Sequence, residues 1–388
     1  MNADVIVIGG GVIGSSITYH LARDGVKVKQ LEKGSIANQG AASRASAGGI
    51  RLNNRDPREL DLAKASIKRW ESLEEELEAN LEYGSAGQIM LFDDRYMMDE
   101  VEKQVIDDLK NGIEAKIVIG SELNELVPSL SPTITKAIHY PSGGQANGLL
   151  TTVAYTSKAR RLGAEIITGI EVYSIVKENN RVVGVETSNG FIHANTVINA
   201  AGAWTPALHE TLGLSLPQIK HSIRQMSATY PAPLSTLPGP TIGAKGTKIS
   251  LKQTIDGRIR AGGGYITKPG PDKYTGIFNE EELEEQRNTV LSLLPAVEAY
   301  EIDFTYYGAE AYCIDNIPIL GPIPEVEGYL IAAGFSGHGF TLSPAIGMVM
   351  AEVAQGKQPS ISIEAFKIDR SYNKPVEGET SAIHNLPG

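Results

Sequence analysis

A glycine-rich turn between an apolar strand and a helix opens the chain. Residues 5–8, Val-Ile-Val-Ile, form a continuous β-branched run that is typical of a parallel strand buried on both faces. This run leads directly into Gly9, Gly11 and Gly14, and residues 15–23 then carry apolar positions at helical spacing. Such a unit presents free backbone N–H groups at a helix N-terminus, where they bind a pyrophosphate. The sequence therefore predicts a dinucleotide site.

An acidic residue closes the second predicted strand. Glu32 follows the stretch at residues 26–31 and lies 18 positions beyond Gly14, near the place where such sites use a carboxylate to accept the ribose hydroxyls. The same charge repels a 2′-phosphate, which disfavours NADP. Since the chain contains 41 glycines, the alternative is a glycine-rich turn in an ordinary α/β domain. NAD, FAD and other adenine nucleotides all remain open at this point.

Length and composition limit the class of protein. A chain of 388 residues predicts two domains, and a net charge of −11 argues against a nucleic-acid partner. Cys313 is the single cysteine, which excludes an internal disulfide and a multi-cysteine metal site, and no histidine spacing predicts another metal site. Residues 5–22 carry no charged side chain, but Asp4 and the interrupting glycines argue against a leader peptide or a membrane span. We expect a cytoplasmic protein.

Helical and strand-type patterns alternate along the chain. Apolar positions three and four apart predict one helix over residues 57–80, and a helix over residues 149–162 leads into several short strands. Between residues 217 and 304 the pattern is of strand type with Pro and Gly turns, which predicts an antiparallel sheet. A second glycine loop, at residues 334–341, opens a helix that runs to Ala354.

These elements predict an α/β fold, α+β overall, with two domains. A Rossmann-type nucleotide-binding domain is assembled from residues 1–82, 146–214 and 308–388. An antiparallel-sheet domain, formed by residues 83–145 and 215–307, is inserted between these segments and is expected to bind the substrate.

Five motifs occur in an order shared with a known family. They are the fingerprint at residues 9–14 with Glu32, Ser-Arg-Ala-Ser-Ala-Gly-Gly at 43–49, Ala-Ala-Gly-Ala-Trp at 200–204, Asp-Asn-Ile-Pro-Ile-Leu-Gly at 315–321, and the loop at 334–340. Together they resemble the FAD-dependent D-amino acid oxidase superfamily over essentially the whole chain. Within it, the chain is most similar to glycine oxidases, sarcosine oxidases and dye-linked amino-acid dehydrogenases.

The resemblance implies FAD as the cofactor. It implies that the glycine fingerprint and Glu32 hold the ADP half, that the backbone of Val172 meets the adenine, and that two small-residue segments contact the isoalloxazine ring. The implied FAD-binding residues are Gly9, Gly11, Val12, Ile13, Gly14, Glu32, Lys33, Ala42, Ser43, Ser46, Ala47, Gly48, Gly49, Val172, Ala201, Gly202, Trp204, Gly337, His338, Gly339, Phe340 and Thr341.

The resemblance also bears on how the FAD is attached. Sarcosine oxidases tether the flavin through a cysteine, whose position is occupied here by Gly308, and Cys313 falls five places later. We therefore predict non-covalent FAD and a semi-buried Cys313.

The implied reaction removes a hydride from a carbon that bears an amine, and water then hydrolyses the imine. The substrate would be an amino acid or a secondary amine, and the electron acceptor would be oxygen, a carrier or a partner subunit in a homo- or hetero-oligomer. Two alternatives stay open. One is oxidation of a 2-hydroxy acid or a glycerol phosphate on the same scaffold. The other is a flavin-bearing subunit of a hetero-oligomeric dehydrogenase, or a scaffold without turnover.

Glu310 is the first candidate at the substrate end. Glycine oxidases place a carboxylate-binding arginine five residues before the aspartate of the Asp-x-x-Pro stretch, and this chain has Glu310 there. A carboxylate does not bind a carboxylate. Glu310 either binds a cationic part of the substrate or is a hydrogen-bonded structural acid.

Arg51 is the second candidate, because it matches the arginine that sarcosine oxidases use for the substrate carboxylate. The alternative is a salt bridge from Arg51 to Asp56 or Glu59. Thr341 replaces the lysine that cooperates with this arginine in sarcosine oxidases.

His338 is the third candidate, through a hydrogen bond to the flavin or the substrate or through packing behind them. Sarcosine oxidases also place a lysine over the flavin, and the alignment puts Arg260 near that position. Tyr265 and Tyr307 are expected as pocket walls or as core residues.

Overall fold

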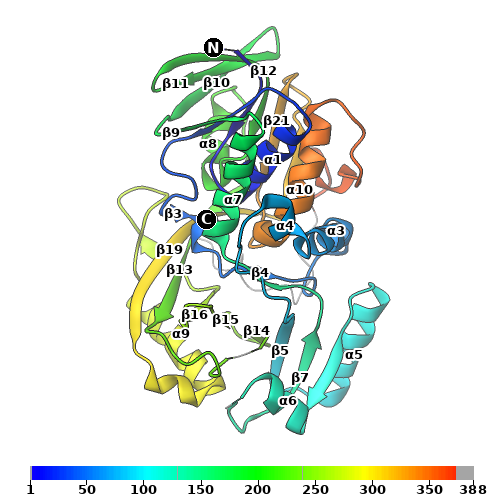
Figure 1. The fold of residues 1–388 in the computed structure, drawn as a ribbon, viewed down its shortest axis with the longest axis vertical. Helices are drawn as coiled ribbons and strands as arrows, with labels where there is room; N and C mark the ends of the chain where they lie inside the picture. The colour runs from blue at the N-terminus through cyan, green and yellow to red at the C-terminus, as the bar shows by residue number, and fades with distance from the viewer. Residues whose placement is uncertain (1, 129, 238, 373–388) are drawn as a thin grey trace.

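The structure is a computed structural model that describes residues 2–128, 130–237 and 239–372. Two large sheets lie one above the other in Figure 1, with most of the helices packed around the upper sheet. All three segments of the predicted nucleotide-binding domain supply strands of the upper sheet. Residue 1 and residues 373–388 of that prediction lie outside the described residues.

The upper sheet has eight strands, with the order β10-β11-β12-β1-β2-β9, while β21 pairs with β12 and β20 with β21. The central pairs are parallel, as the β-branched runs predict. Its strands are β1 (Asn2–Ile8), β2 (Val28–Glu32), β9 (Glu165–Thr168), β10 (Val172–Glu178), β11 (Arg181–Thr187), β12 (Gly190–Asn199), β20 (Ile319–Pro322) and β21 (Tyr329–Ala333).

Helices cover this sheet in a close-packed layer. Helix α1 packs against both α7 and α10, and α3 packs against α10. A Cβ atom on Gly347 of α10 would lie 2.0 Å from Ser16 Oγ of α1, so this glycine permits the close contact between the two helices. The helices of this part are α1 (Val12–Arg23), α3 (Leu60–Trp70), α4 (Leu73–Leu77), α7 (Gly148–Arg161), α8 (Thr205–Glu210) and α10 (Gly339–Ala354).

The helix predicted over residues 57–80 is wrong as a single element. The structure has a 3₁₀ turn at Pro57–Glu59, followed by α3 and α4, with a break at Ser72. Helix α4 ends where Glu78 adopts a left-handed φ of 55°. Glu74 Oε1 accepts hydrogen bonds from the backbone N–H groups of Leu81 (2.7 Å) and Tyr83 (3.3 Å), which draw the following chain back along the helix.

The lower sheet has nine strands in the order β3-β19-β13-β16-β15-β14-β5-β7-β6. It is not purely antiparallel as predicted, because β14 pairs with β5 and β3 with β19 in parallel. Both parallel pairs join segments separated by a large part of the chain, as parallel pairing requires a long crossover. The strands are β3 (Gly40–Ala41), β5 (Gln88–Asp93), β6 (Lys116–Ile119), β7 (Ile134–Tyr140), β13 (Ile219–Thr229), β14 (Thr241–Ala244), β15 (Ile249–Gln253), β16 (Ile259–Gly263) and β19 (Ile302–Cys313).

Short elements and three helices complete the lower part. Helix α2 (Ala42–Ala45) and the pair β4 (Gly49–Ile50) with β8 (Gly144–Gln145) connect it to the upper part. The helices are α5 (Met98–Lys110), α6 (Gly120–Leu126) and α9 (Glu280–Leu293). Strand β19 runs through the predicted boundary at residues 307 and 308, and the division into two domains stays a prediction. Among the described residues, no helix has the length and apolar character needed to cross a membrane.

Candidate functional site

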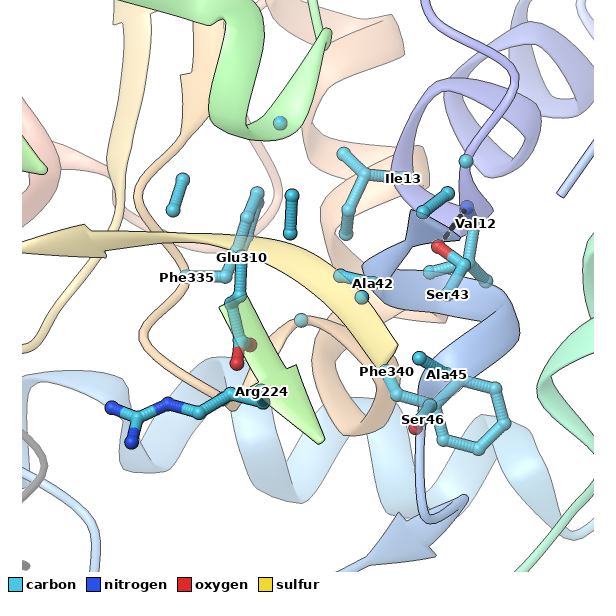
Figure 2. Close-up of a pocket in the computed structure, with 18 of the residues that line it drawn as sticks. Val12, Ile13, Ala42, Ser43, Ala45, Ser46, Arg224, Glu310, Phe335 and Phe340 are labelled. Carbon is cyan, nitrogen blue, oxygen red and sulfur yellow. Dashed lines mark hydrogen bonds between the residues drawn. The ribbon is translucent and has the colours of Figure 1, made fainter. Parts of the chain in front are cut away.

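A cavity of about 900 Å³ lies between the two sheets and is lined by residues from both of them. Its volume is at the upper end of the range for small-molecule sites, as a dinucleotide needs. Figure 2 shows part of its lining, with Ser43 and Val12 at one side and Glu310 and Arg224 at the other. The two sides differ in chemistry and are described in turn.

The glycine turn forms the first side. Gly9 has a φ of +112°, and a Cβ atom there would lie 2.5 Å from the carbonyl oxygen of Ala200. A Cβ atom on Gly14 would lie 2.2 Å from the Gly9 carbonyl oxygen. The backbone N–H of Val12, at the start of α1, donates to Ser43 Oγ (2.9 Å), drawn as a dashed line in Figure 2. This helix N-terminus faces the cavity and suits a phosphate.

Glu32 closes β2 beside the glycine turn and lines the cavity. Its Oε2 accepts a hydrogen bond from the Gly10 N–H (2.6 Å), and its Oε1 accepts one from the Gly34 N–H (2.7 Å). A carboxylate has about four lone-pair positions, so these two bonds fix its orientation and leave acceptor capacity for two ribose hydroxyls. The residues present therefore fit the ribose of an ADP group.

Aromatic and apolar side chains flank the ribose position. Val172 lines the cavity at the start of β10. Lys33 Nζ lies 4.1 Å from the ring centroid of Trp204, and the ring of Tyr274 lies 4.7 Å from that of Trp204. Lys33, Trp204 and Tyr274 all line the cavity.

The segments expected against the isoalloxazine ring also lie along the cavity. A Cβ atom on Gly48 would lie 2.0 Å from the carbonyl oxygen of Ala146, so only glycine permits the backbone path at this point. Four of the predicted FAD-binding residues do not line the cavity themselves, namely Gly14, Gly48, His338 and Thr341. The other predicted residues that line it are Gly9, Gly11, Val12, Ile13, Glu32, Lys33, Ala42, Ser43, Ser46, Ala47, Gly49, Val172, Ala201, Gly202, Trp204, Gly337, Gly339 and Phe340.

The opposite side of the cavity carries a charged cluster that the sequence analysis did not assemble. Tyr312 Oη donates to Glu310 Oε2 (2.9 Å), and Arg224 Nε donates to the same Tyr312 oxygen (2.9 Å). The Arg224 guanidinium lies 4.8 Å from the centroid of the Tyr312 ring. Glu310, Tyr312 and Arg224 all line the cavity. The alternation of a strand places residues 310 and 312 on one face, but nothing in the sequence places Arg224 opposite them.

Comparison with known proteins agrees with this geometry. The family described as FAD dependent oxidoreductase, DAO, matches residues 4–353. The chain belongs to this family. The protein is therefore a DAO-family FAD-dependent oxidoreductase, and FAD is its cofactor. The glycine turn and the second sheet that faces it across the cavity are the parts of the fold that would enclose the FAD.

Three similar proteins illustrate the range of the family. The sarcosine oxidase subunit beta of Arthrobacter sp. is 26% identical over 376 residues, which cover 95% of this chain and 90% of that protein. The glycine oxidase of Bacillus licheniformis is 28% identical, with 95% and 97% covered. The crystal structure of L-proline dehydrogenase from P. horikoshii has a TM-score of 0.86 and 30% identity, with 95% and 97% covered.

Arg51 lines the cavity of this oxidoreductase. Its backbone N–H donates to Thr341 Oγ1 (3.3 Å), and its guanidinium Nη1 donates to the carbonyl oxygen of Asn53 (2.9 Å). The alternative interpretation is a salt bridge from Arg51 to Asp56 or Glu59. In the structure Asp56 forms an ion pair with Arg58, and Glu59 forms one with Arg55. Thr341 thus holds the backbone of Arg51 through this hydrogen bond.

His338 belongs to a buried trio of ionisable side chains, in which Glu59 is the central member between His338 and Arg55. His338 Nδ1 lies 2.7 Å from Glu59 Oε2, and Arg55 Nη1 donates to the same oxygen (3.3 Å). Burial lowers the pKa of His338, while His338 and Arg55 lower the pKa of Glu59 against the effect of its burial. Arg55 Nε also donates to the carbonyl oxygen of Arg51 (2.9 Å). The trio therefore links the start of α10 to the backbone that carries Arg51.

A buried lysine, Lys252, lies beside the flavin-side backbone. A Cβ atom on Gly48 would lie 2.6 Å from Lys252 Nζ. Burial, aided by the nearby Arg260 charge, lowers the pKa of Lys252 to about 7. Arg260 pairs with Lys252 in the sheet register, but its guanidinium lies near Asp256 (3.7 Å). Lys252 is thus the lysine that lies against Gly48, on the strand next to that of Arg260.

Cys313 and two tyrosines complete the comparison with the sequence. Cys313 is fully buried, and Arg370 Nη2 donates to its Sγ (3.3 Å). Gly308 lines the cavity, whereas Cys313 lies behind the lining, as fits non-covalent FAD. Tyr307 lines the cavity and Tyr265 is a core residue. Within the described residues, no group of three or more His, Cys, Asp or Glu is arranged to hold a metal ion.

Proposed function

We propose that this FAD-dependent oxidoreductase oxidises the C–N bond of an amino acid or a secondary amine. The observation that carries the proposal is the presence of Arg51 and Glu310, two opposite charges, in the lining of one cavity. An amino acid carries the complementary pair of charges, a carboxylate and an ammonium. FAD, when bound, accepts the hydride from the substrate carbon. The names of the similar proteins, which act on sarcosine, glycine and L-proline, support this substrate class.

The residues of the chain would orient the substrate rather than break its bonds. The planar guanidinium of Arg51 suits a carboxylate, and Thr341 together with Arg55 fixes the backbone that presents it. Tyr307 and Phe335 line the same cavity and would exclude water from the reacting carbon. A 2-hydroxy acid carries no cationic group that could meet the Glu310 carboxylate, which is why we favour the amine.

A second candidate concerns the assembly. The similarity to a protein named as subunit beta, over 90% of its length, favours a flavin-bearing subunit of a hetero-oligomer. Electrons would then pass to a partner subunit or carrier instead of oxygen. The cytoplasmic location and the electron acceptor stay predictions of the sequence.

The test is anaerobic reduction of the yellow holoprotein. Glycine, sarcosine, L-proline, D-amino acids, opines and 2-hydroxy acids would be mixed with it in turn, and bleaching of the flavin absorbance would be recorded. We expect bleaching by at least one amine and by none of the hydroxy acids. Bleaching by hydroxy acids alone, or by no compound, would refute the proposal. Admission of air would then report whether oxygen reoxidises the flavin.

A further inference from the structure

The carboxyl group of Glu310 is held in a fixed place at the edge of the cavity. It retains some exposed surface, and this surface belongs to the cavity that Glu310 lines. The Tyr312 hydroxyl donates to Oε2 from the same strand, and the Gly337 backbone N–H donates to the carboxyl group from the loop before α10. Figure 2 shows the Glu310 side chain pointing toward the Arg224 side chain.

The surroundings of Glu310 place opposing demands on its charge. Burial raises the pKa of Glu310 above its usual range, while the Tyr312 hydroxyl, the Arg224 charge and the Gly337 N–H oppose that effect. A carboxyl group whose pKa is moved toward neutrality by its environment is suited to exchange a proton with a bound ligand. The cluster therefore stabilises the ionised form of Glu310 and leaves the carboxylate basic enough to accept a proton.

No other acid among the described lining residues has this position. The cavity lining contains four acidic residues, and two of them, Glu32 and Glu171, lie beside the ribose and adenine positions. Asp272 lies in an exposed turn, where its Oδ1 accepts from the backbone N–H groups of Tyr274 and Thr275. Glu310 is left as the carboxylate at the far side of the cavity.

We propose that Glu310 is a catalytic base that takes the proton from the ammonium group of the substrate. The inference rests on the proposed function, because it assigns the proton that an amine must lose before its carbon can give up a hydride. Amines of this class have a pKa of about 10 and arrive protonated at neutral pH.

The proton balance is simple. The N–H bond of the substrate ammonium breaks, the proton forms an O–H bond on the Glu310 carboxylate, and the substrate becomes a neutral amine with a free electron pair. Tyr312 continues to donate to Oε2, so Oε1 is the oxygen left to take the proton. Arg224 does not transfer a proton; it holds the Tyr312 hydroxyl in place and is a positioning residue.

The first experiment compares wild-type holoprotein with Glu310→Gln between pH 7 and pH 10, using an amine that bleaches the wild type. The second-order rate constant of anaerobic flavin reduction is measured by stopped flow. Without the base only the neutral amine reacts, so Glu310→Gln should be about 100- to 1000-fold slower at pH 7. The ratio should narrow about tenfold per pH unit and nearly close at pH 10. A ratio that stays constant with pH, or no loss at pH 7, would overturn the assignment.

A binding experiment tests the same contact without turnover. 2-Aminoisobutyrate has no hydrogen on its α-carbon, and isobutyrate is its counterpart without the amine; their dissociation constants follow from changes in the flavin absorbance. Glu310→Gln should weaken 2-aminoisobutyrate at least tenfold and leave isobutyrate unchanged or tighter. Equal weakening of both ligands would mean a distorted pocket, and no weakening would mean no contact with the ammonium. Either result would overturn the proposal.

One further variant tests the role of Tyr312, and a second variant outside the cluster serves as a control. Tyr312→Phe removes a donor that favours the ionised carboxylate, so the acidic limb of the wild-type pH profile should move to higher pH. Glu298→Gln, an exposed change in the same part of the chain, is the matched control and should leave both experiments unchanged. Failure of the proposed function appears as a wild type that no amine bleaches. Failure of this inference appears as a bleached wild type with an equally fast Glu310→Gln variant.

Discussion

The two sides of the cavity are built by different means. The side predicted to hold the ADP group is made of backbone from one short stretch of chain, with the glycine turn, the start of α1 and Glu32 all within the first 32 residues. The opposite side carries charged side chains from distant segments, namely Arg224 and Glu310 with Tyr312, and Arg51 lines the same cavity. A local backbone cradle requires glycines at fixed spacing, whereas a cluster of side chains requires only that the strands meet.

This difference predicts that the two sides of the cavity can change independently. The backbone cradle serves any substrate, because it binds only the cofactor. Side chains at the other end can change one at a time without disturbing the cradle, and Glu310 in place of an arginine is such a change. The following variants test how independent the two sides are.

The largest effect on the cavity is expected for Gly9→Ala on the backbone side, because this change should remove bound FAD as well as stability. The new Cβ atom would meet the Ala200 carbonyl oxygen at 2.5 Å, and the φ of +112° disfavours any L-residue. We expect loss of about 2–4 kcal/mol of stability and of bound FAD. The flavin-to-protein absorbance ratio and the melting temperature measure both.

Gly25→Ala is the matched control for Gly9→Ala. Gly25 also has a positive φ, +78°, but nothing lies within 4 Å of its would-be Cβ atom. It should cost about 1 kcal/mol and keep its full FAD content. Equal FAD loss in both variants would show that general strain, and not the cradle, is responsible.

The contrast between local backbone and distant side chains also explains which features could be predicted from the sequence. The helix predicted over residues 149–162 appears as α7 (Gly148–Arg161), and the predicted last helix ends at Ala354 as expected, because each pattern needs only its own residues. The parallel pairing of β14 with β5 could not be read, since it joins strands about 150 residues apart. Arg224 was missed for the same reason, because only the pairing of β13 with β19 brings it beside Tyr312.

The second effect concerns the buried trio of Glu59, Arg55 and His338. Glu59→Ala removes the partner of Arg55 and His338 and leaves a buried guanidinium uncompensated. We expect a loss of about 3–5 kcal/mol in the free energy of unfolding, measured by urea denaturation of the holoprotein. Glu364→Ala, which breaks the exposed pair with Lys367, is the control and should cost less than about 1 kcal/mol. Similar losses in the two variants would contradict the role of the trio.

The trio also predicts how stability depends on pH. The pKa values of both Glu59 and His338 are lower in the folded state, so the unfolded chain binds more protons as the pH falls. Their contribution is present above the unfolded pKa values and is lost on acidification, starting below about pH 6.5 with the histidine. The melting temperature should fall over this range, and less steeply in His338→Asn. An equally steep fall in that variant would assign the effect to other groups.

A third effect concerns the carboxylate of the substrate. Arg51→Gln removes a guanidinium that would form two charge-assisted hydrogen bonds, so KM for amino acids should rise about a hundredfold. Amines without a carboxylate should be unaffected, and Arg51→Lys should recover only part of the loss. Arg181→Gln, on an exposed pair with Glu327, is the control. An equal rise in KM for amines without a carboxylate would contradict the assignment.

The smallest effect is expected at Lys252, whose Nζ lies against Gly48. If FAD binds along this segment, the lysine charge would contribute about 1–3 kcal/mol at an effective dielectric constant of ~20 and would favour negative charge on oxygen during reoxidation. Because the pKa of Lys252 is about 7, the lysine is charged below that pH and neutral above it. Reoxidation of the reduced flavin by oxygen should therefore slow as the pH rises through about 7. Lys252→Met should be about tenfold slower at pH 6 and should lose this pH dependence, whereas the exposed Lys268→Met should match the wild type. A Lys252→Met variant with the wild-type pH profile would show that this cation does not act on the flavin.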